Sequence, residues 1–134
     1  MKFVSLQGRE ITIKSPHEYR INWDGPSLSK FQFAVKQWLK KKWCGHIVFE
    51  ELPVVGTKFT LDFFNSSARV AVEAQGAQHF EFSSLFHGKS KLAFSDQLRR
   101  DTLKSDYCDK NGIRLIEIFP KDVLDDALFK KLFS

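Results

Sequence analysis

The sequence predicts an α/β (α+β) domain with the core order helix, three strands, helix, strand, preceded by an added β-hairpin. The chain of 134 residues is long enough for one domain with its own hydrophobic core. Three strand-like runs between residues 46 and 76 are separated by short turns, which indicates an antiparallel meander. Helical patterns lie on both sides of this meander, so we expect a mixed central sheet flanked by helices.

The first half of the chain predicts a hairpin and a helix. Residues 3–14 alternate loosely around Gly8, which is typical of a β-hairpin. The breaker Asp24-Gly25-Pro26 is followed by Ser27 and Ser29, two candidate N-caps for a helix over 28–43. We expect this helix to place Lys36 and Lys40 on its polar side and to bury a stripe made of Leu28, Phe31, Val35, Trp38 and Leu39.

The second half predicts the sheet and two more helices. Strands are expected at 46–54, 58–65 and 69–76, followed by a loop over 83–91. A helix is predicted from 93 to 110, with Leu98 and Cys108 facing inward, and it ends at Asn111-Gly112. A mostly buried strand over 113–119 and an amphipathic helix over 122–133 complete the chain. Within the single domain (1–134), we distinguish an N-terminal β extension (1–26), a core (27–120) and a C-terminal helix (121–134).

Charge is distributed unevenly along the chain, whose net charge is +5. Residues 1–49 hold nine Lys and Arg against three Asp and Glu, whereas residues 50–134 hold twelve against thirteen. This balance suits a protein that holds a polyanion and presents carboxylates to it, although a merely soluble basic protein would show it too. With no apolar run of about 20 residues, no signal-peptide pattern and only two cysteines, we expect a cytoplasmic protein.

Polar side chains interrupt two of the predicted strands. Asp62 lies inside the apolar run TLDFF. On the next strand, Glu73 and Gln75 lie on one face and Val72 lies on the other. In a meander, Asp62 and Glu73 fall on neighbouring strands, where two carboxylates repel each other unless a cation lies between them. Carboxylate oxygens and water are the ligands that Mg²⁺ prefers, and Mn²⁺ is the expected substitute. The sequence therefore predicts a divalent-metal site on these strands.

Further polar residues are candidates for the same site. Either Glu50 or Glu51 could add an acidic group, and the pattern leaves open which one faces inward. Asp101 lies beside the apolar stripe of the second helix and needs a partner, which could be His79, the metal, or a local pair with Arg100 or Lys104. His79 is either an acid–base residue or a polar turn residue that closes its strand.

These residues resemble a known superfamily. Asp62, ten intervening residues and Glu73-Ala74-Gln75 are similar to the motif of the PD-(D/E)xK nucleases, whose restriction-endonuclease-like core is also α-β-β-β-α-β. The segments FEELPVVGTKFTLDFF, VAVEAQGAQHF and RRDTLKSDYCDKNGIRLIEI together resemble the branch of very-short-patch repair and phage or homing-type endonucleases, over residues 27–120. The resemblance implies Mg²⁺-dependent hydrolysis of DNA phosphodiesters, with Asp62 and Glu73 as metal ligands. It also gives catalytic positions to His79 and Asp101, and it puts Gln75 where the superfamily has lysine.

The resemblance implies DNA as the partner. Phosphate contacts are expected from a set of lysines, namely Lys40, Lys41, Lys42, Lys89, Lys91 and Lys104. No base-recognition motif is visible, so we expect binding guided by structure, to branched, nicked or mismatched DNA in phage or bacterial repair or recombination. A Holliday junction resolvase would act as a homodimer.

Two other functions remain open at this point. Glutamine can neither carry a positive charge nor act as a base, so Gln75 favours an inactive nucleic-acid-binding module that retains the fold. A structural protein with no nucleic acid partner would leave the acidic residues and His79 unexplained.

Overall fold

The structure, a computed structural model, describes residues 1–76 and 88–134, with side chains in the second range described from residue 98 onward. The elements of this described part, in chain order, are β1 (Lys2–Val4), β2 (Glu10–Thr12), the 3₁₀ helix η1 (Pro16–Tyr19), α1 (Lys30–Trp43), β3 (Val48–Pro53), β4 (Thr60–Asn65), β5 (Val70–Ala74), α2 (Gly88–Lys110), β6 (Arg114–Ile118) and α3 (Asp126–Phe133). The predicted element order, including the N-terminal hairpin and the C-terminal helix, is confirmed.

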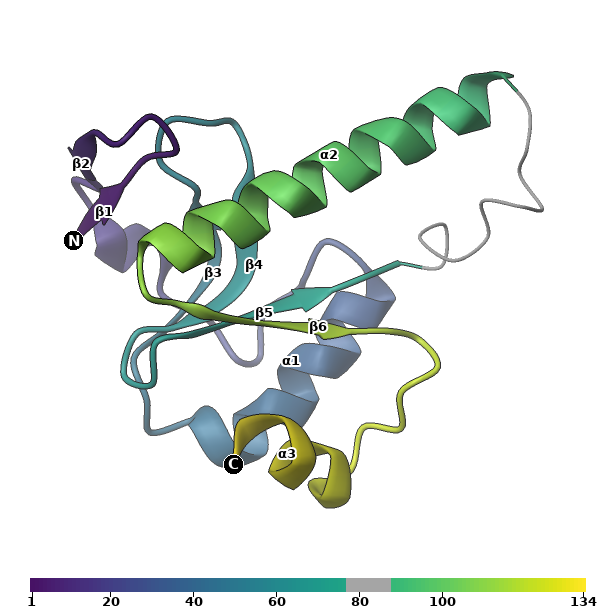
Figure 1. The fold of residues 1–134 in the computed structure, drawn as a ribbon. Coiled ribbons are helices and arrows are strands. Elements are labelled where there is room, and N and C mark those ends of the chain that lie inside the picture. The colour runs from purple at the N-terminus through teal and green to yellow at the C-terminus, as the bar shows by residue number, and fades with distance from the viewer. Residues whose placement is uncertain (77–87) are drawn as a thin grey trace.

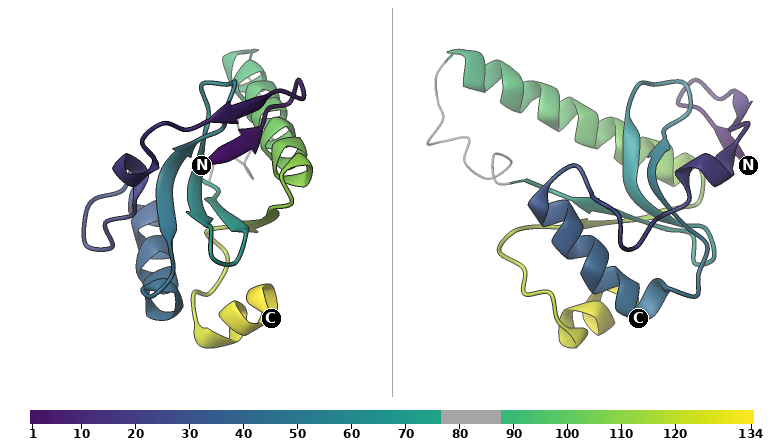
Figure 2. Two further views of the ribbon diagram at one scale, coloured as in Figure 1. Left: turned by 90° about the vertical axis from the view of Figure 1, so that its left-hand side faces the viewer. Right: turned by 180° about the vertical axis from the view of Figure 1, so that it is seen from behind.

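The central sheet is mixed, as predicted. Its four strands lie in the order β3-β4-β5-β6, with β3, β4 and β5 antiparallel and β6 parallel to β5. α2 connects the two parallel strands and crosses one face of the sheet, while α1 and α3 cover the other face (Figures 1 and 2). The described part of the chain is therefore a mixed α/β domain of three layers.

Each face of the sheet has its own apolar core. On the α1 side, Trp38 and Trp43 pack against Phe129 and Phe133 of α3, above a row of strand residues that includes Val48, Phe63, Val72, Ile116 and Ile118. On the α2 side, Tyr107 and Cys108 pack with Phe3 of the hairpin and with strand residues that include Phe49, Leu52, Leu61, Phe64 and Ala71. Burial of these side chains on both faces supplies the main driving force for the fold.

The N-terminal hairpin is attached to the end of α2. The backbone N–H of Val4 donates to Asn111 Oδ1 over 2.7 Å, and Asn111 Nδ2 donates to the carbonyl of Val4 over 2.9 Å. Gly112 follows with a φ of +64°, the left-handed conformation that glycine adopts easily after a helix. The Asn-Gly stop signal is thus confirmed, and its asparagine also holds β1 in place.

Two details of the α1 prediction are wrong. The helix begins at Lys30, with Ser29 Oγ accepting from the N–H of Gln32 over 3.0 Å, so Ser29 is the N-cap. Leu28 therefore lies before the helix and is 78% exposed instead of joining the buried stripe.

Lys36, expected on the polar side of α1, is completely buried. Its ammonium lies 2.8 Å from Glu50 Oε1 and donates to the carbonyls of Asn22, Gly25 and Pro26. The turn over residues 22–26 folds back across the helix, so these carbonyls provide the acceptors that make burial of the charge possible.

The prediction for α2 was also partly wrong. The helix begins at Gly88, so residues 88–91 of the predicted loop are helical, while residues 83–87 lie outside the described part. Leu98 is 47% exposed, and the inward side is formed instead by Lys104, Tyr107 and Cys108. Six residues separate Leu98 from Lys104, which places Leu98 about 120° from Lys104 around the helix axis and so outside the inward side.

None of the described helices combines the length and the apolar character that crossing a bilayer requires.

We expect Lys36→Met to destabilise the protein by about 3–5 kcal/mol, because it leaves Glu50, whose side chain is only 14% exposed, without its counter-ion. Urea unfolding at neutral pH measures this loss, and the exposed Lys41→Met on the same helix is the matched control. Equal stability of the two variants would show that the Lys36–Glu50 pair does not hold the turn over 22–26 in place.

Candidate functional site

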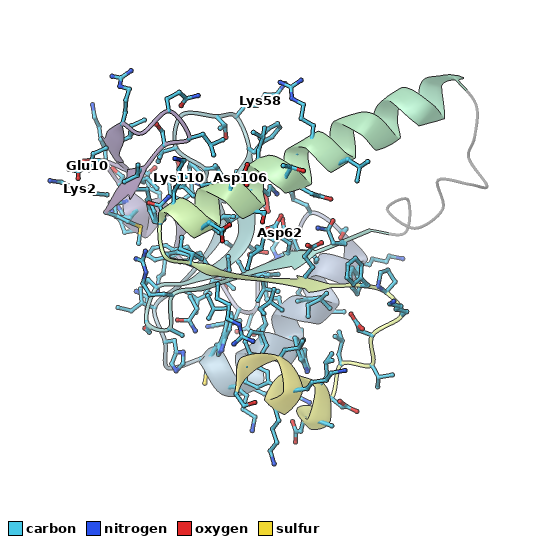
Figure 3. All side chains as sticks on the ribbon, in the orientation of Figure 1. Lys2, Glu10, Lys58, Asp62, Asp106 and Lys110 are labelled. Carbon is cyan, nitrogen blue, oxygen red and sulfur yellow. The ribbon has the colours of Figure 1, made fainter. Side chains whose placement is uncertain are left out.

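Asp62 of β4 and Glu73 of β5 are joined where the pairing of these strands ends. The register between the strands runs from Asn65↔Val70 to Phe63↔Val72. Beyond it, the backbone N–H of Asp62 donates to Glu73 Oε2 over 2.6 Å, and the N–H of Ala74 donates to Asp62 Oδ2 over 2.8 Å. Each carboxylate thus accepts a backbone N–H that a carbonyl of the neighbouring strand would accept in a regular ladder. The predicted proximity of Asp62 and Glu73 on neighbouring strands is confirmed. Figure 3 shows Asp62 between the ribbons of α2 and β5.

Lys104 of α2 is the cation of this site. Its Nζ lies 2.5 Å from Glu73 Oε1, and the two side chains are only 10% and 6% exposed. Lys104, expected among the phosphate-contacting lysines, is therefore buried and paired with Glu73. The sequence gives one sign that Lys104 faces inward. Asp101, Lys104 and Cys108 are spaced i, i+3, i+7, so they share one face of the helix.

The charges of the site do not balance. Burial, and next the carboxylate of Glu73, raise the pKa of Asp62 to about 8, while Lys104 opposes the shift. Burial likewise raises the pKa of Glu73 against the effect of Lys104. Burial alone would lower the pKa of Lys104, but Glu73 and then Asp62 raise it above its ordinary value, so the ammonium stays charged. One lysine faces more buried carboxylate charge than it can neutralise.

Gln75 and Asp101 lie next to this group. Gln75 is buried on the same face as Glu73, as predicted, and its Nε2 donates to Glu117 Oε2 of β6 over 3.0 Å. A small pocket between α2 and the sheet is lined by Glu73, Gln75, Asp101, Lys104, Leu115 and Glu117. The structure therefore brings Asp101 to the candidate site, from the helix side.

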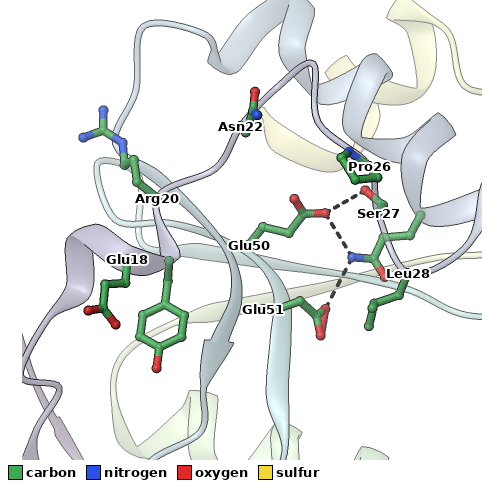
Figure 4. Close-up of a pocket in the computed structure, with 10 residues that line it drawn as sticks. Glu18, Arg20, Asn22, Pro26, Ser27, Leu28, Glu50 and Glu51 are labelled. Atoms are coloured by element: carbon green, nitrogen blue, oxygen red, sulfur yellow. Dashed lines mark hydrogen bonds between the residues drawn. The ribbon is translucent and has the colours of Figure 1, made fainter.

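Glu50 and Glu51 share one partner although they are consecutive strand residues. Gln32 Nε2 lies 3.1 Å from Glu50 Oε2 and 3.3 Å from Glu51 Oε2 (Figure 4). Glu51 has a φ of +54°, which is rare for a residue other than glycine and interrupts the usual alternation of faces along β3. Both side chains line a pocket of about 340 Å³ that also includes Arg20, Asn22 and Ser27.

The two glutamates differ in what neutralises them. Glu50 pairs with Lys36 and also accepts from Ser27 Oγ over 2.7 Å. Glu51 Oε1 accepts from Thr60 Oγ1 over 2.8 Å, and the charge of Glu51 contributes to the raised pKa of Asp62 and of Glu73. Of the two candidates, Glu51 is thus the one that acts electrostatically on the site.

The remaining predicted residues do not line the site in the described structure. Lys40 pairs with Asp24 over 2.9 Å, and Lys41 and Lys42 lie at the exposed end of α1, on the opposite face of the sheet from α2. Lys89 and Lys91 belong to the first turns of α2, but their side chains are outside the described part, as is the whole of His79.

The described residues contain no group of three or more His, Cys, Asp or Glu side chains that could hold a metal ion. The oxygen donors available on adjacent strands are the carboxylates of Asp62 and Glu73. A pair of this kind completes the octahedral shell of Mg²⁺ only together with water or with oxygens of a substrate.

The raised pKa of Asp62 predicts a pH-dependent stability. Because its native pKa of about 8 exceeds its ordinary value of 3.8, the native state holds a proton that the unfolded state releases, and stability falls as pH rises through this range. Asp62→Asn keeps an acceptor for the N–H of Ala74 without the charge. We expect this variant to exceed the parent in unfolding free energy at pH 9, and the gain to shrink towards pH 4.

Urea unfolding at several pH values measures the effect, and Asp106→Asn, at an exposed position of α2, is the control that should keep the pH slope of the parent. If Asp62→Asn and the parent show the same pH slope, Asp62 does not carry the excess buried charge.

Comparisons with known proteins find relatives of part of the chain. It is 39% identical over 66 residues to "Uncharacterized protein 094L" of Frog virus 3 (isolate Goorha), which is 49% of this chain and 43% of that protein. It is 39% identical over 66 residues to "Uncharacterized protein 033L" of Invertebrate iridescent virus 3, or 49% of this chain and 34% of that protein. It is 41% identical over 74 residues to "Uncharacterized protein 307L" of Invertebrate iridescent virus 6, which is 54% of this chain and 36% of that protein.

The chain therefore spans less than half the length of these viral relatives. No family model matches it. No solved structure matches it either.

Proposed function

We propose that the chain is a metal-dependent DNA endonuclease domain with a restriction-endonuclease-like fold. The observation that carries the proposal is the buried group formed by Asp62 and Glu73, which lie on adjacent strands with Lys104 as their cation. The element order α1-β3-β4-β5-α2-β6 supports the fold, because it repeats the core order of the PD-(D/E)xK nucleases.

The donors of this site suit Mg²⁺. Asp62 and Glu73 would hold the ion, because both are hard oxygen donors and because their charge, once Asp62 has released its proton, exceeds that of Lys104. When bound, the ion would polarise a phosphodiester oxygen and lower the pKa of a water molecule for in-line attack on phosphorus.

Lys104 supplies the positive charge that Gln75 lacks. Its ammonium reaches Glu73 from α2 instead of from the strand position two residues after Glu73. Because its pKa is raised, Lys104 serves as a cation and hydrogen-bond donor towards a phosphate oxygen, and not as a base. Asp101 lines the same pocket and would help to orient this end of α2. His79 remains the candidate for accepting the proton of the attacking water.

The proposed substrate is branched, nicked or mismatched DNA, including a Holliday junction, for which the active form would be a homodimer. The similarity to viral proteins favours a role in a virus-infected cell, with the cytoplasm as the proposed place of action.

One observation favours a second function, that of an inactive nucleic-acid-binding module. Both carboxylate oxygens of Glu73 are occupied, one by Lys104 and one by the backbone N–H of Asp62. An ion could bind only by displacing or sharing these contacts, which lowers its affinity.

A cleavage assay separates the two functions. We expect the full chain to cut supercoiled, single-stranded or four-way-junction DNA with Mg²⁺ or Mn²⁺ and not with EDTA. Asp62→Asn and Glu73→Gln should each slow cleavage at least about 100-fold, because each removes a metal donor. Asp106→Asn is the matched acidic control and should cut like the parent. DNA binding without cleavage under every metal condition would support the inactive module instead.

A second assay tests Lys104. Lys104→Met should slow cleavage at least about 100-fold through loss of charge at the phosphate, whereas Lys110→Met, at an exposed position near the end of the same helix, should not. Circular dichroism checks that each variant is folded, and Lys104→Arg, which keeps the charge, should recover part of the rate. A folded Lys104→Met protein that cuts at the parent's rate would remove Lys104 from the mechanism.

A further inference from the structure

A second group of cations lies beside α2, on the side of the loop that joins β3 and β4. A groove of about 280 Å³ between this helix and the loop that joins β3 and β4 is lined by Lys58, Phe59, Arg99 and Arg100. Lys58 and Arg99 are exposed, and none of the described residues that line the groove is acidic. Figure 3 shows Lys58 in this loop beside the middle of α2. Three cationic side chains around one hollow suit an anion.

The walls of the groove are held in position. In the loop, the N–H of Val54 donates to the carbonyl of Phe59 over 2.9 Å, and the Thr57 hydroxyl both donates to Val54 and accepts from the N–H of Phe59. The guanidinium of Arg100 lies 5.4 Å from the centre of the Phe59 ring, a cation–π contact that orients its plane. This contact holds α2 and the loop together, with the exposed Lys58 and Arg99 on the two sides of the groove.

The groove lies one helical turn from the candidate site. Arg100 precedes Lys104 by four residues, which is about 6 Å along the helix axis. Lys104 faces Glu73 in the interior, while Arg99 and Lys58 face solvent. A strand with one phosphate at Lys104 would thus have a neighbouring phosphate close to this groove.

We propose that the groove binds a backbone phosphate of the DNA strand, next to the phosphate that is cut. This assignment rests on the proposed function. The contacts would be independent of base identity, because the exposed Lys58 and Arg99 meet phosphate oxygens and the Phe59 ring is already engaged by Arg100. Binding here would place the strand along α2, not along the lysines at the end of α1.

The test measures DNA binding in EDTA, so that it does not depend on cleavage. Fluorescence anisotropy of a labelled four-way junction and of single-stranded DNA gives Kd over a series of salt concentrations. The double variant Lys58→Ala/Arg99→Ala should weaken binding about 10-fold and reduce the slope of log Kd against log salt by about 1. Both residues are exposed, so folding should be unaffected.

Lys130→Ala/Lys131→Ala is the control, because it removes two positive charges from exposed positions of α3, on the other face of the sheet. It should change neither Kd nor the salt slope.

The outcomes separate the two proposals. If the groove variant binds like the parent, or if the parent binds no DNA, the groove assignment is overturned. If the groove variant weakens binding but the parent never cuts DNA, the groove stands as a contact to a DNA phosphate and the nuclease proposal falls. A groove that inorganic phosphate fills without competing with DNA would be an isolated anion site, which also overturns the assignment.

Discussion

The buried ion pair between Lys104 and Glu73 is the interaction on which the rest of the structure depends. It fastens α2 to the sheet, at the place where β4 and β5 stop pairing through their backbones. Around it, the carboxylates of Asp62 and Glu73 accept backbone N–H groups that a regular ladder would have satisfied. A buried pair of this kind adds little net stability by itself, but loss of either partner leaves an uncompensated charge. The carboxyl groups of this small region outnumber its cation, and the native state offsets this by keeping a proton on Asp62, whose pKa is raised to about 8.

Lys36 is a second buried lysine that pairs with a glutamate, but its surroundings differ from those of Lys104. Lys36 is enclosed by Glu50 and three backbone carbonyls, and Glu50 in turn accepts from Ser27 and Gln32. Every donor and acceptor in this pair is satisfied locally, so it acts as a structural clamp for the turn before α1. Around Asp62, by contrast, carboxylates outnumber cations, and the pKa of Asp62 is raised to about 8. Perturbation of this kind is typical of functional sites, which distinguishes the two clusters.

The helix α2 places positive charge at two depths. Lys104 lies in the interior beside Glu73, while Arg99 and Arg100 line a groove between α2 and the loop that joins β3 and β4, about one turn away. A strand of DNA lying along this helix would therefore meet cations both at the acidic group and beside it. The lysines at the end of α1 lie across the sheet from this path and would need a different approach of the substrate.

The sequence by itself determined the order of the elements, the hairpin at Gly8, the stop at Asn111-Gly112, and the meeting of Asp62 with Glu73. These follow from local signals, since turn residues, the period of two in strands and short connections need no distant partner. Only the tertiary structure decided that Lys36 and Lys104 are buried and that Glu51, not Glu50, acts on the site. A lysine on a helix is predicted to be exposed unless something folds over it, and here the turn over 22–26 and the sheet under α2 supply the acceptors. Those acceptors lie outside the helix that carries each lysine, 31 residues away for Lys104 and Glu73, so the spacing of Asp101, Lys104 and Cys108 reveals a shared face of α2 but not the buried partner.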